Sequence, residues 1–231
     1  SITSTVQANT TAGFSIVTYT GTQANATVGH GLGKVPAMLI IKCRDASNGW
    51  QVFHKGNTSA PETELLRLNE TSGTADNALP WNDTYPTSTV FTIGANDENN
   101  KSGDSHVAYC FAEIEGYSKF GSYTGNGNAD GAFVYTGFRP AWVMIKKTSG
   151  SANWFLYDTK RNPHNLVVNR LIANGSEAEN TGSGDDIDIL SNGWKARASA
   201  SALNGNGDSF IYMAFAENPF VSSKGVPVTA R

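Results

Sequence analysis

Short stretches in which apolar and polar residues alternate run along the whole chain, and they predict β-strands. Phe14, Ile16 and Thr18 alternate with the residues at 15, 17 and 19, so the two sets point to opposite faces. Residues 35–43 are almost continuously apolar, which is typical of a strand buried on both faces. Nothing in the pattern favours a long helix. Further strands are predicted at residues 50–54, 65–69, 89–93, 106–115, 120–124, 140–147, 153–158, 166–172, 186–190, 193–198 and 209–217.

The pattern occurs twice, at a constant offset of 104 residues. Residues 36–42 (PAMLIIK) return as residues 140–146 (PAWVMIK), and 140 − 36 = 104. Residues 105–113 (SHVAYCFAE) return as residues 209–217 (SFIYMAFAE). A fixed offset indicates that one structural unit was duplicated. We therefore interpret a feature present in both copies as structural, and a feature present in one copy as a candidate for a specific activity.

The repeat and the strand spacing predict an all-β protein made of two tandem β-sandwich units, lectin-like or jelly-roll-like. Six or seven short strands per copy with Gly, Asn, Asp and Ser between them are typical of such folds. One composite sandwich, to which each copy gives half of the strands, is the alternative. The expected organisation is a polar N-terminal linker (1–12), repeat 1 (13–116), repeat 2 (117–220) and a C-terminal tail (221–231).

Composition and charge exclude several classes of protein. Charged residues make up only 16% of the 231 residues and 24 are Gly, which agrees with strands joined by polar turns. The net charge is −3 and no basic stripe is present, so we expect no nucleic-acid partner. No apolar run approaches the length of a membrane span, so we expect no membrane insertion.

The cysteines and two tryptophans are interpreted as structural. Cys43 and Cys110 are predicted to be free, buried thiols, because Ala214 stands where Cys110 would recur. A disulfide between them is the alternative. Trp50 recurs as Trp154, so both are expected to anchor cores rather than to bind a ligand.

Two carboxylate pairs are the candidates for catalysis, and both are incomplete. Glu113 and Glu115 are two apart on a predicted strand and so point to one face, as glycan-cleaving chemistry requires of a carboxylate pair. Glu113 recurs as Glu217, but the position equivalent to Glu115 holds proline. Asp186 and Asp188 form a similar pair. We therefore predict no catalytic residues, and we expect that the protein is not an enzyme.

Residues 126–131 (NGNADG) match the opening of a calcium-binding loop. Asn126, Asn128 and Asp130 stand at alternate positions, and Gly131 is sixth. The Glu that should end such a loop is replaced by Gly137. Because Asn and Gly also suit a β-turn, no metal site is predicted and these three residues stay weak candidates. No cofactor is expected.

Three long strings resemble an uncharacterised domain that is common in structural proteins of bacteriophages, especially marine ones. They are GYSKFGSYTGNGNADGAFVYTGFRPAWVMIKK (116–147), YDTKRNP (157–163) and FIYMAFAENPF (210–220), and the resemblance covers about residues 12–220. That domain is usually attached to tail-fibre-like or other virion-surface proteins. The resemblance implies a β-rich, lectin-like module, made in the host cytoplasm and displayed on the virion surface. It assigns no chemistry to individual residues.

The expected function is therefore non-enzymatic adhesion, in which a tail-fibre-like module binds a host receptor or surface glycan. A structural capsid or tail decoration protein is the first alternative, and a glycan-cleaving enzyme is the second. The expected protein partners are other virion proteins and further copies of the chain, with a trimer as the expected state because tail-fibre-like proteins are generally homotrimers. Exposed aromatic side chains beside Asn- and Asp-rich loops would favour adhesion, because sugars stack on rings and hydrogen-bond to amides and carboxylates.

The predicted ligand-binding residues lie in two polar turns before the repeated terminal strands. Residues 95–104 and 199–208 occupy equivalent positions and diverge in sequence, apart from a shared Gly-Asp at the end. A rigid sheet with variable polar loops is a common way for a scaffold to carry a binding site. Ordinary solvated turns are the alternative. The residues expected at the exposed tips are Asp97, Asn99, Asn100, Asn204 and Asn206.

Overall fold

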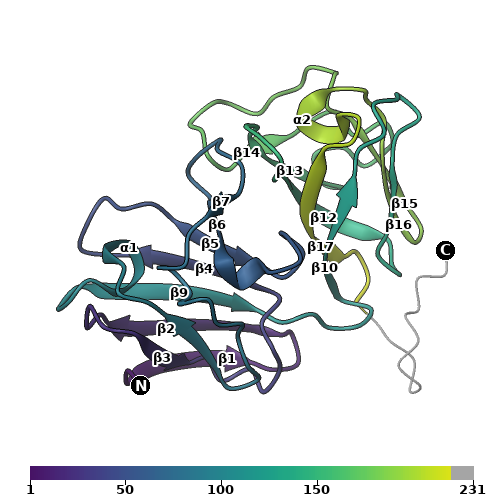
Figure 1. Cartoon of the computed structure of the whole chain (residues 1–231). Helices are drawn as coiled ribbons and strands as arrows, with labels where there is room; N and C mark the ends of the chain where they lie inside the picture. The colour runs from purple at the N-terminus through teal and green to yellow at the C-terminus, as the bar shows by residue number, and fades with distance from the viewer. Residues whose placement is uncertain (220–231) are drawn as a thin grey trace. The chain divides into compact units, whose positions relative to one another are not determined.

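The computed structural model of the chain describes residues 1–219, which are all-β and divide into two compact units (Figure 1). Unit 1 comprises Ser1–Asn69 and Thr74–Glu113, and unit 2 comprises Glu70–Gly73 and the chain from Ile114 onward. The predicted boundary between residues 116 and 117 lies three residues beyond the one between Glu113 and Ile114. The expected C-terminal tail, residues 221–231, lies outside the described residues. No helix in the described chain is long and apolar enough to cross a membrane.

Unit 1 contains a seven-stranded and a two-stranded antiparallel sheet. The strand orders are β1-β2-β9-β4-β5-β6-β7 and β3-β8. Two short helices interrupt the strands: a 3-10 turn at Pro61–Thr63 and α1 at Asp97–Asn100. The strands are β1 Ser4–Asn9, β2 Phe14–Thr20, β3 Ala26–Gly29, β4 Met38–Cys43, β5 Gln51–His54, β6 Glu64–Arg67, β7 Ala75–Asp76, β8 Val90–Ile93 and β9 Ser105–Phe111.

The core of unit 1 lies between its two sheets. Val17 and Leu39 of the large sheet and Phe91 and Ile93 of the small sheet belong to one buried cluster. Alternation within each strand produces this arrangement, since every second side chain points to the same face. Fully burying one such side chain stabilises the fold by about 1.5–3 kcal/mol relative to leaving it exposed.

Unit 2 contains a five-stranded and a three-stranded antiparallel sheet. The strand orders are β10-β17-β12-β13-β14 and β11-β16-β15. A one-turn helix, α2 at Ser201–Asn204, precedes the last strand. The strands are β10 Ser118–Thr124, β11 Phe133–Tyr135, β12 Pro140–Lys147, β13 Trp154–Asp158, β14 Leu171–Ile172, β15 Ile187–Leu190, β16 Gly193–Ala196 and β17 Ser209–Ala216.

Unit 2 is likewise a sandwich with its own core. Val143 and Tyr212 of the larger sheet pack in one cluster with Val134, Ile189 and Trp194 of the smaller sheet. Each of the two clusters draws its residues from one half of the chain only. The alternative of one composite sandwich is therefore wrong for the described residues.

The two units share strand order and pairing register. The order β2-β9-β4-β5-β6 in unit 1 matches β10-β17-β12-β13-β14 in unit 2. Phe14 pairs with Phe111 in unit 1, and Ser118 pairs with Phe215 in unit 2, so both partners move by 104 residues. The helices α1 and α2 also differ by 104. The two units thus have equivalent frameworks, while their origin by duplication stays an interpretation of the sequence repeat.

The first sheet has one strand more than this shared framework on the side of β2. β1 pairs with β2 over six residues, from Ser4 opposite Tyr19 to Asn9 opposite Phe14. The prediction of a linker at residues 1–12 is therefore wrong. Because β1 lies at the sheet edge and is mostly exposed, it lacks the apolar alternation that marks a half-buried strand. In unit 2, β10 itself is the edge of its sheet among the described strands.

Candidate functional site

Three of the five predicted ligand-binding residues are buried, so the prediction of exposed tips is wrong for them. Asn99, Asn100 and Asn204 have no exposed surface, whereas Asp97 and Asn206 are exposed. The segments expected to be open turns contain the one-turn helices α1 and α2, in which these three side chains are buried. A buried amide cannot contact an external ligand, so these residues do not form a binding site.

The side chain of Asn204 forms hydrogen bonds to both the loop after β10 and the segment before α2. Its side-chain Nδ2 donates to the carbonyl oxygens of Asn128 (2.8 Å) and Ala198 (3.0 Å) and to Oδ1 of Asn126 (2.8 Å). Its Oδ1 accepts a hydrogen bond from the backbone nitrogen of Asn126 at 3.0 Å. One buried side chain therefore holds two loops together.

Asn100 does the same in unit 1. Its Nδ2 donates to the carbonyl oxygens of Ala24 (2.7 Å) and Gly94 (2.8 Å), and its Oδ1 accepts from the backbone nitrogen of Thr22 (2.8 Å). Asn100 and Asn204 are 104 residues apart, so applying the rule that features of both copies are structural would have marked them as structural, although both were predicted to bind a ligand. Asn99 is equivalent to Leu203, and an apolar residue at the equivalent position was a second sign that position 99 is buried.

The side-chain oxygens of the three weak candidate metal ligands have partners within the protein. Oδ1 of Asn126 accepts from the backbone nitrogen of Asn128 (3.0 Å), and Oδ1 of Asn128 accepts from that of Asp130 (2.9 Å). The Asp130 carboxylate forms an ion pair with Nζ of Lys195 at 2.6 Å. Within residues 1–219, no group of three or more His, Cys, Asp or Glu side chains is arranged to hold a metal ion.

The carboxylate pair at the end of repeat 1 does not lie on a strand. β9 ends at Phe111, before both glutamates. Glu113 forms an ion pair with Lys55, with Oε2 and Nζ 2.6 Å apart, and Glu115 is exposed. The argument that both carboxylates point to one face of a strand is therefore wrong.

The cysteines are free and buried, as predicted. Burial raises the pKa of the Cys110 thiol to about 12, which keeps it protonated and unreactive near neutral pH. Cys43 pairs across β4 and β9 with His106, and both side chains are fully buried, so this thiol and imidazole have no access to a substrate. Trp154 is buried as predicted, whereas Trp50 is only partly buried.

Lys146 is a buried cation with a structural role. Its Nζ donates to the carbonyl oxygens of Thr71 (2.8 Å) and Ala152 (2.6 Å) and lies 5.9 Å from the ring centroid of Trp154. Burial lowers the pKa of Lys146 to about 8. Lys42, its equivalent in repeat 1, also donates to two backbone carbonyls, so this feature belongs to both units.

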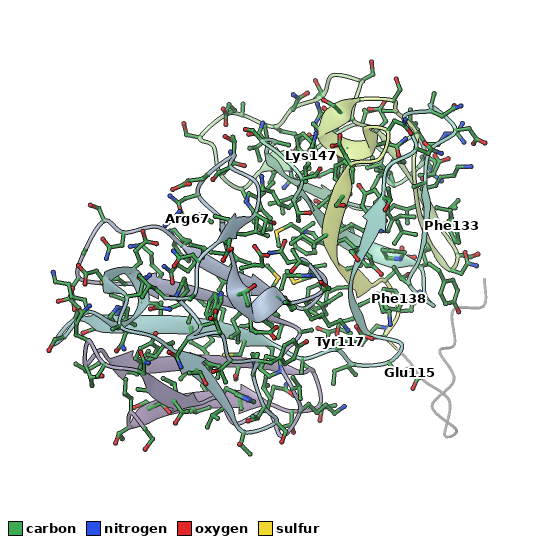
Figure 2. All side chains as sticks on the ribbon, in the orientation of Figure 1. Arg67, Glu115, Tyr117, Phe133, Phe138 and Lys147 are labelled. Atoms are coloured by element: carbon green, nitrogen blue, oxygen red, sulfur yellow. The ribbon has the colours of Figure 1, made fainter. Side chains whose placement is uncertain are left out.

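Two aromatic side chains are exposed on the outer face of the three-stranded sheet of unit 2. Phe133 is 47% exposed and Tyr135 is 63% exposed, while Val134 between them points into the core. Residues two apart on a strand share a face and lie about 6.6 Å apart. Figure 2 shows Phe133 on the side of this sheet that faces away from β17. The two side chains thus lie on one face of β11, and we call them the aromatic strip.

The pairing of β11, β16 and β15 arranges this face in two rows across the sheet. In the first row, an aromatic ring is followed by a cation and a carboxylate; in the second, a ring is followed by glycine and an aliphatic side chain. We call this surface the β11 face, and its rows are Phe133, Lys195 and Asp188, and Tyr135, Gly193 and Leu190.

Charged groups at the edge of the β11 face neutralise one another. Asp130 pairs with Lys195 at 2.6 Å, and Arg197 lies 3.5 Å from Asp188 and 3.9 Å from Asp130. The hydrogen bond from Lys195 lowers the pKa of Asp130, so its carboxylate stays ionised at neutral pH. The Asp130 side chain is still 76% exposed and that of Arg197 is 42% exposed. Hydrogen-bonding groups of both signs therefore face solvent beside the aromatic strip.

Two glycines keep the backbone close to the rings. A side chain at Gly193 would place its Cβ 2.1 Å from the carbonyl oxygen of Val134 and 3.1 Å from the ring of Phe133. Gly137 has a φ of +83°, which favours glycine, and the hydroxyl oxygen of Tyr135 lies 3.6 Å from where its Cβ would be. Both rings therefore lie beside backbone that carries no side chain.

The β11 face belongs to unit 2 alone. In unit 1 the small sheet is formed by β3 and β8, and β3 (Ala26–Gly29) contains no aromatic residue. In the pairing of the small sheets, the core pair Val28 and Phe91 corresponds to Val134 and Trp194, so the positions equivalent to Phe133 and Tyr135 are Thr27 and Gly29. By the rule stated for the repeat, a feature of one copy is a candidate for a specific activity. The alternating Phe-Val-Tyr was the signal in the sequence, and the predicted strands missed it.

Fold and site together define an all-β protein of two sandwich units with one exposed aromatic face. The chain belongs to the family described as "Domain of unknown function (DUF7483)", whose family model matches residues 1–219. No curated protein matches the chain. No solved structure matches it either.

Proposed function

We propose that this protein is a non-enzymatic adhesion module of a bacteriophage virion surface, and that it binds a glycan of the host through the β11 face. The observation that carries the proposal is the pair of exposed rings of Phe133 and Tyr135 beside the 126–130 turn, in only one of two units that share a strand framework. Exposed aromatic groups that gather on one face usually mark an interaction site.

The chemistry of the β11 face suits a sugar. One face of a sugar ring carries C–H groups, which pack on the electron-rich face of an aromatic ring. The hydroxyl groups at the sugar's rim can donate to the exposed carboxylate of Asp130 and accept from the guanidinium of Arg197. A strip of rings with polar groups on one side provides both kinds of contact.

Binding without cleavage is favoured by the state of the carboxylates. Glycan cleavage by a carboxylate pair needs one carboxylic acid with a raised pKa, which donates a proton to the leaving group. Lys195 instead lowers the pKa of Asp130. Asp188 forms an ion pair with Arg197 at 3.5 Å.

The virion setting is supported by the resemblance of residues 12–220 to a domain of phage structural proteins. Low charge and polar turns rich in Asn, Ser, Gly and Thr suit a surface module that contacts glycans. On this proposal the partners are other virion proteins, further copies of the chain and a host-surface glycan.

The proposal is tested with the full chain on an array of bacterial surface polysaccharides and defined oligosaccharides. We expect the wild-type protein to bind a subset of them, and the double variant Phe133→Ala with Tyr135→Ala to lose that binding. Leu79→Ala is the matched control, because Leu79 is 55% exposed but lies in unit 1. Equal binding by the double variant, or no binding by the wild type to any glycan, would overturn the proposal.

A structural role in the virion is the second candidate, and the edge of β10 favours it. β10 is a seven-residue strand with a free side among the described strands, at the place where unit 1 adds β1 to β2. Such an edge can pair with a strand of another chain. Light scattering tests this: Ser122→Lys should dissociate an oligomer built on this edge, whereas Thr20→Lys on β2 should not. A monomeric wild-type chain at micromolar concentration would count against this role.

A further inference from the structure

We infer that the β11 face selects neutral sugar residues over acidic ones, an inference that rests on the proposed function. It concerns the class of glycan, which the aromatic strip alone does not decide. The decisive observation is the balance of charge around the rings: two cations, Lys195 and Arg197, lie among two carboxylates, Asp130 and Asp188.

The cations of this face are already engaged. Nζ of Lys195 is 2.6 Å from Oδ1 of Asp130, and the guanidinium of Arg197 lies 3.5 Å from Asp188. A uronic or sialic carboxylate that approached either cation would lie beside Asp130 or Asp188, which already pair with these cations. The repulsion between the two negative charges disfavours that complex.

A neutral sugar meets no such cost. Its hydroxyl groups can bond to the outer atoms of the existing ion pairs without breaking them, because the side chain of Asp130 is 76% exposed and that of Arg197 is 42% exposed. The rings of Phe133 and Tyr135 contribute contact with C–H groups, which does not depend on the ligand's charge. Paired charges beside aromatic rings therefore favour hydroxyl-rich, uncharged ligands.

The row order strengthens this inference. Lys195 lies directly between Phe133 and Asp188 in the register, so a ligand stacked on Phe133 has the 130–195 ion pair at its rim. In the neighbouring row, Tyr135 is followed by Gly193 and Leu190, which carry no charge. No position in either row presents a cation without a carboxylate beside it.

The test compares neutral gluco- and manno-oligosaccharides with uronic-acid oligosaccharides of the same length, by calorimetric titration of the full chain. We expect the neutral series to bind and the uronic series to bind at least about tenfold more weakly, which corresponds to about 1.4 kcal/mol. Binding of the neutral series should change little between low and high salt, because no net charge is neutralised.

A charge variant makes the test sharper. Asp130→Asn with Asp188→Asn keeps the shape of the face and releases both cations, so it should bind the uronic series about tenfold more tightly than the wild type does, and with strong salt dependence. Asp83→Asn with Asp97→Asn is the matched control. It makes the same change in net charge at two exposed residues of unit 1 and should leave uronic binding unchanged.

The outcomes separate the two ideas. Tighter binding of the uronic series by the wild type, lost on Lys195→Met, would overturn the selectivity and leave a glycan-binding face in place. Neutral binding that survives Phe133→Ala with Tyr135→Ala would overturn the proposed function itself. Neutral binding that needs both rings, together with a gain for acidic sugars in the 130/188 variant, supports both.

Discussion

Replacing Asn204 with alanine should destabilise unit 2 strongly, although the sequence placed this residue in a solvated turn. Its side chain is fully buried and makes four hydrogen bonds that join the 126–128 turn to the segment before α2. The carbonyl oxygen of Ala198 is in a buried residue and would lose its partner, at a cost of about 1–3 kcal/mol. Each bond to the exposed residues Asn126 and Asn128 adds about 0.5–1.5 kcal/mol, because water can replace it. With three such bonds, we expect a total loss of at least about 3 kcal/mol.

The assay is urea unfolding, followed by circular dichroism and tryptophan fluorescence, with the free energy of unfolding taken from the midpoint and slope. Asn100→Ala makes the equivalent change in unit 1 and should cost a similar amount, because its amide has the same pattern of contacts. Asn206→Ala is the exposed control and should change the free energy of unfolding by less than about 0.5 kcal/mol. If Asn204→Ala were as mild as Asn206→Ala, the internal hydrogen bonds would not stabilise the loops and the reasoning would fail.

Three further predictions concern buried polar groups. Cys43 and Cys110 should resist a thiol reagent in the folded protein and react in urea, since burial holds the Cys110 pKa at about 12; rapid labelling of the native chain would contradict this. Burial lowers the pKa of Lys146 from 10.5 to about 8, so between these pH values the unfolded chain binds more protons than the folded chain. The free energy of unfolding of the wild type should therefore rise from about pH 8 to 10.5, and Lys146→Met should remove this rise. Tyr19→Phe and Tyr123→Phe should each cost about 1–2 kcal/mol in urea unfolding, because each hydroxyl donates to a carbonyl oxygen at 2.6 Å; unequal costs would contradict the equivalence of the units.

The sequence predicts most strands that have one face in a core. Residues 140–147 were expected as a strand and are β12, and residues 186–190 contain β15, because burial on one or both faces leaves a readable apolar pattern. β1 was missed because an exposed edge strand has no buried face to pattern. Residues 166–172 were predicted as a strand, but only Leu171–Ile172 pair.

The candidate site was less accessible to sequence reasoning. Burial of Asn99, Asn100 and Asn204 depends on loops from distant parts of the chain, and no local pattern reports a buried amide. The repeat did indicate a structural role for Asn100 and Asn204, because asparagine occurs at the equivalent position of both copies. Phe133 and Tyr135 were missed because β11 has only three residues, too few for alternation to stand out.

The equivalence of the two units has a practical consequence for any binding experiment. Unit 1 is an internal control in the same polypeptide, at the same concentration and in the same buffer as unit 2. Its small sheet has β3 at the position that β11 occupies in unit 2. Thr27 and Gly29 stand two apart on β3, as Phe133 and Tyr135 do on β11. Under the proposed function, aromatic residues placed at these two positions test whether unit 1 can gain a second glycan site, which would make the chain bivalent.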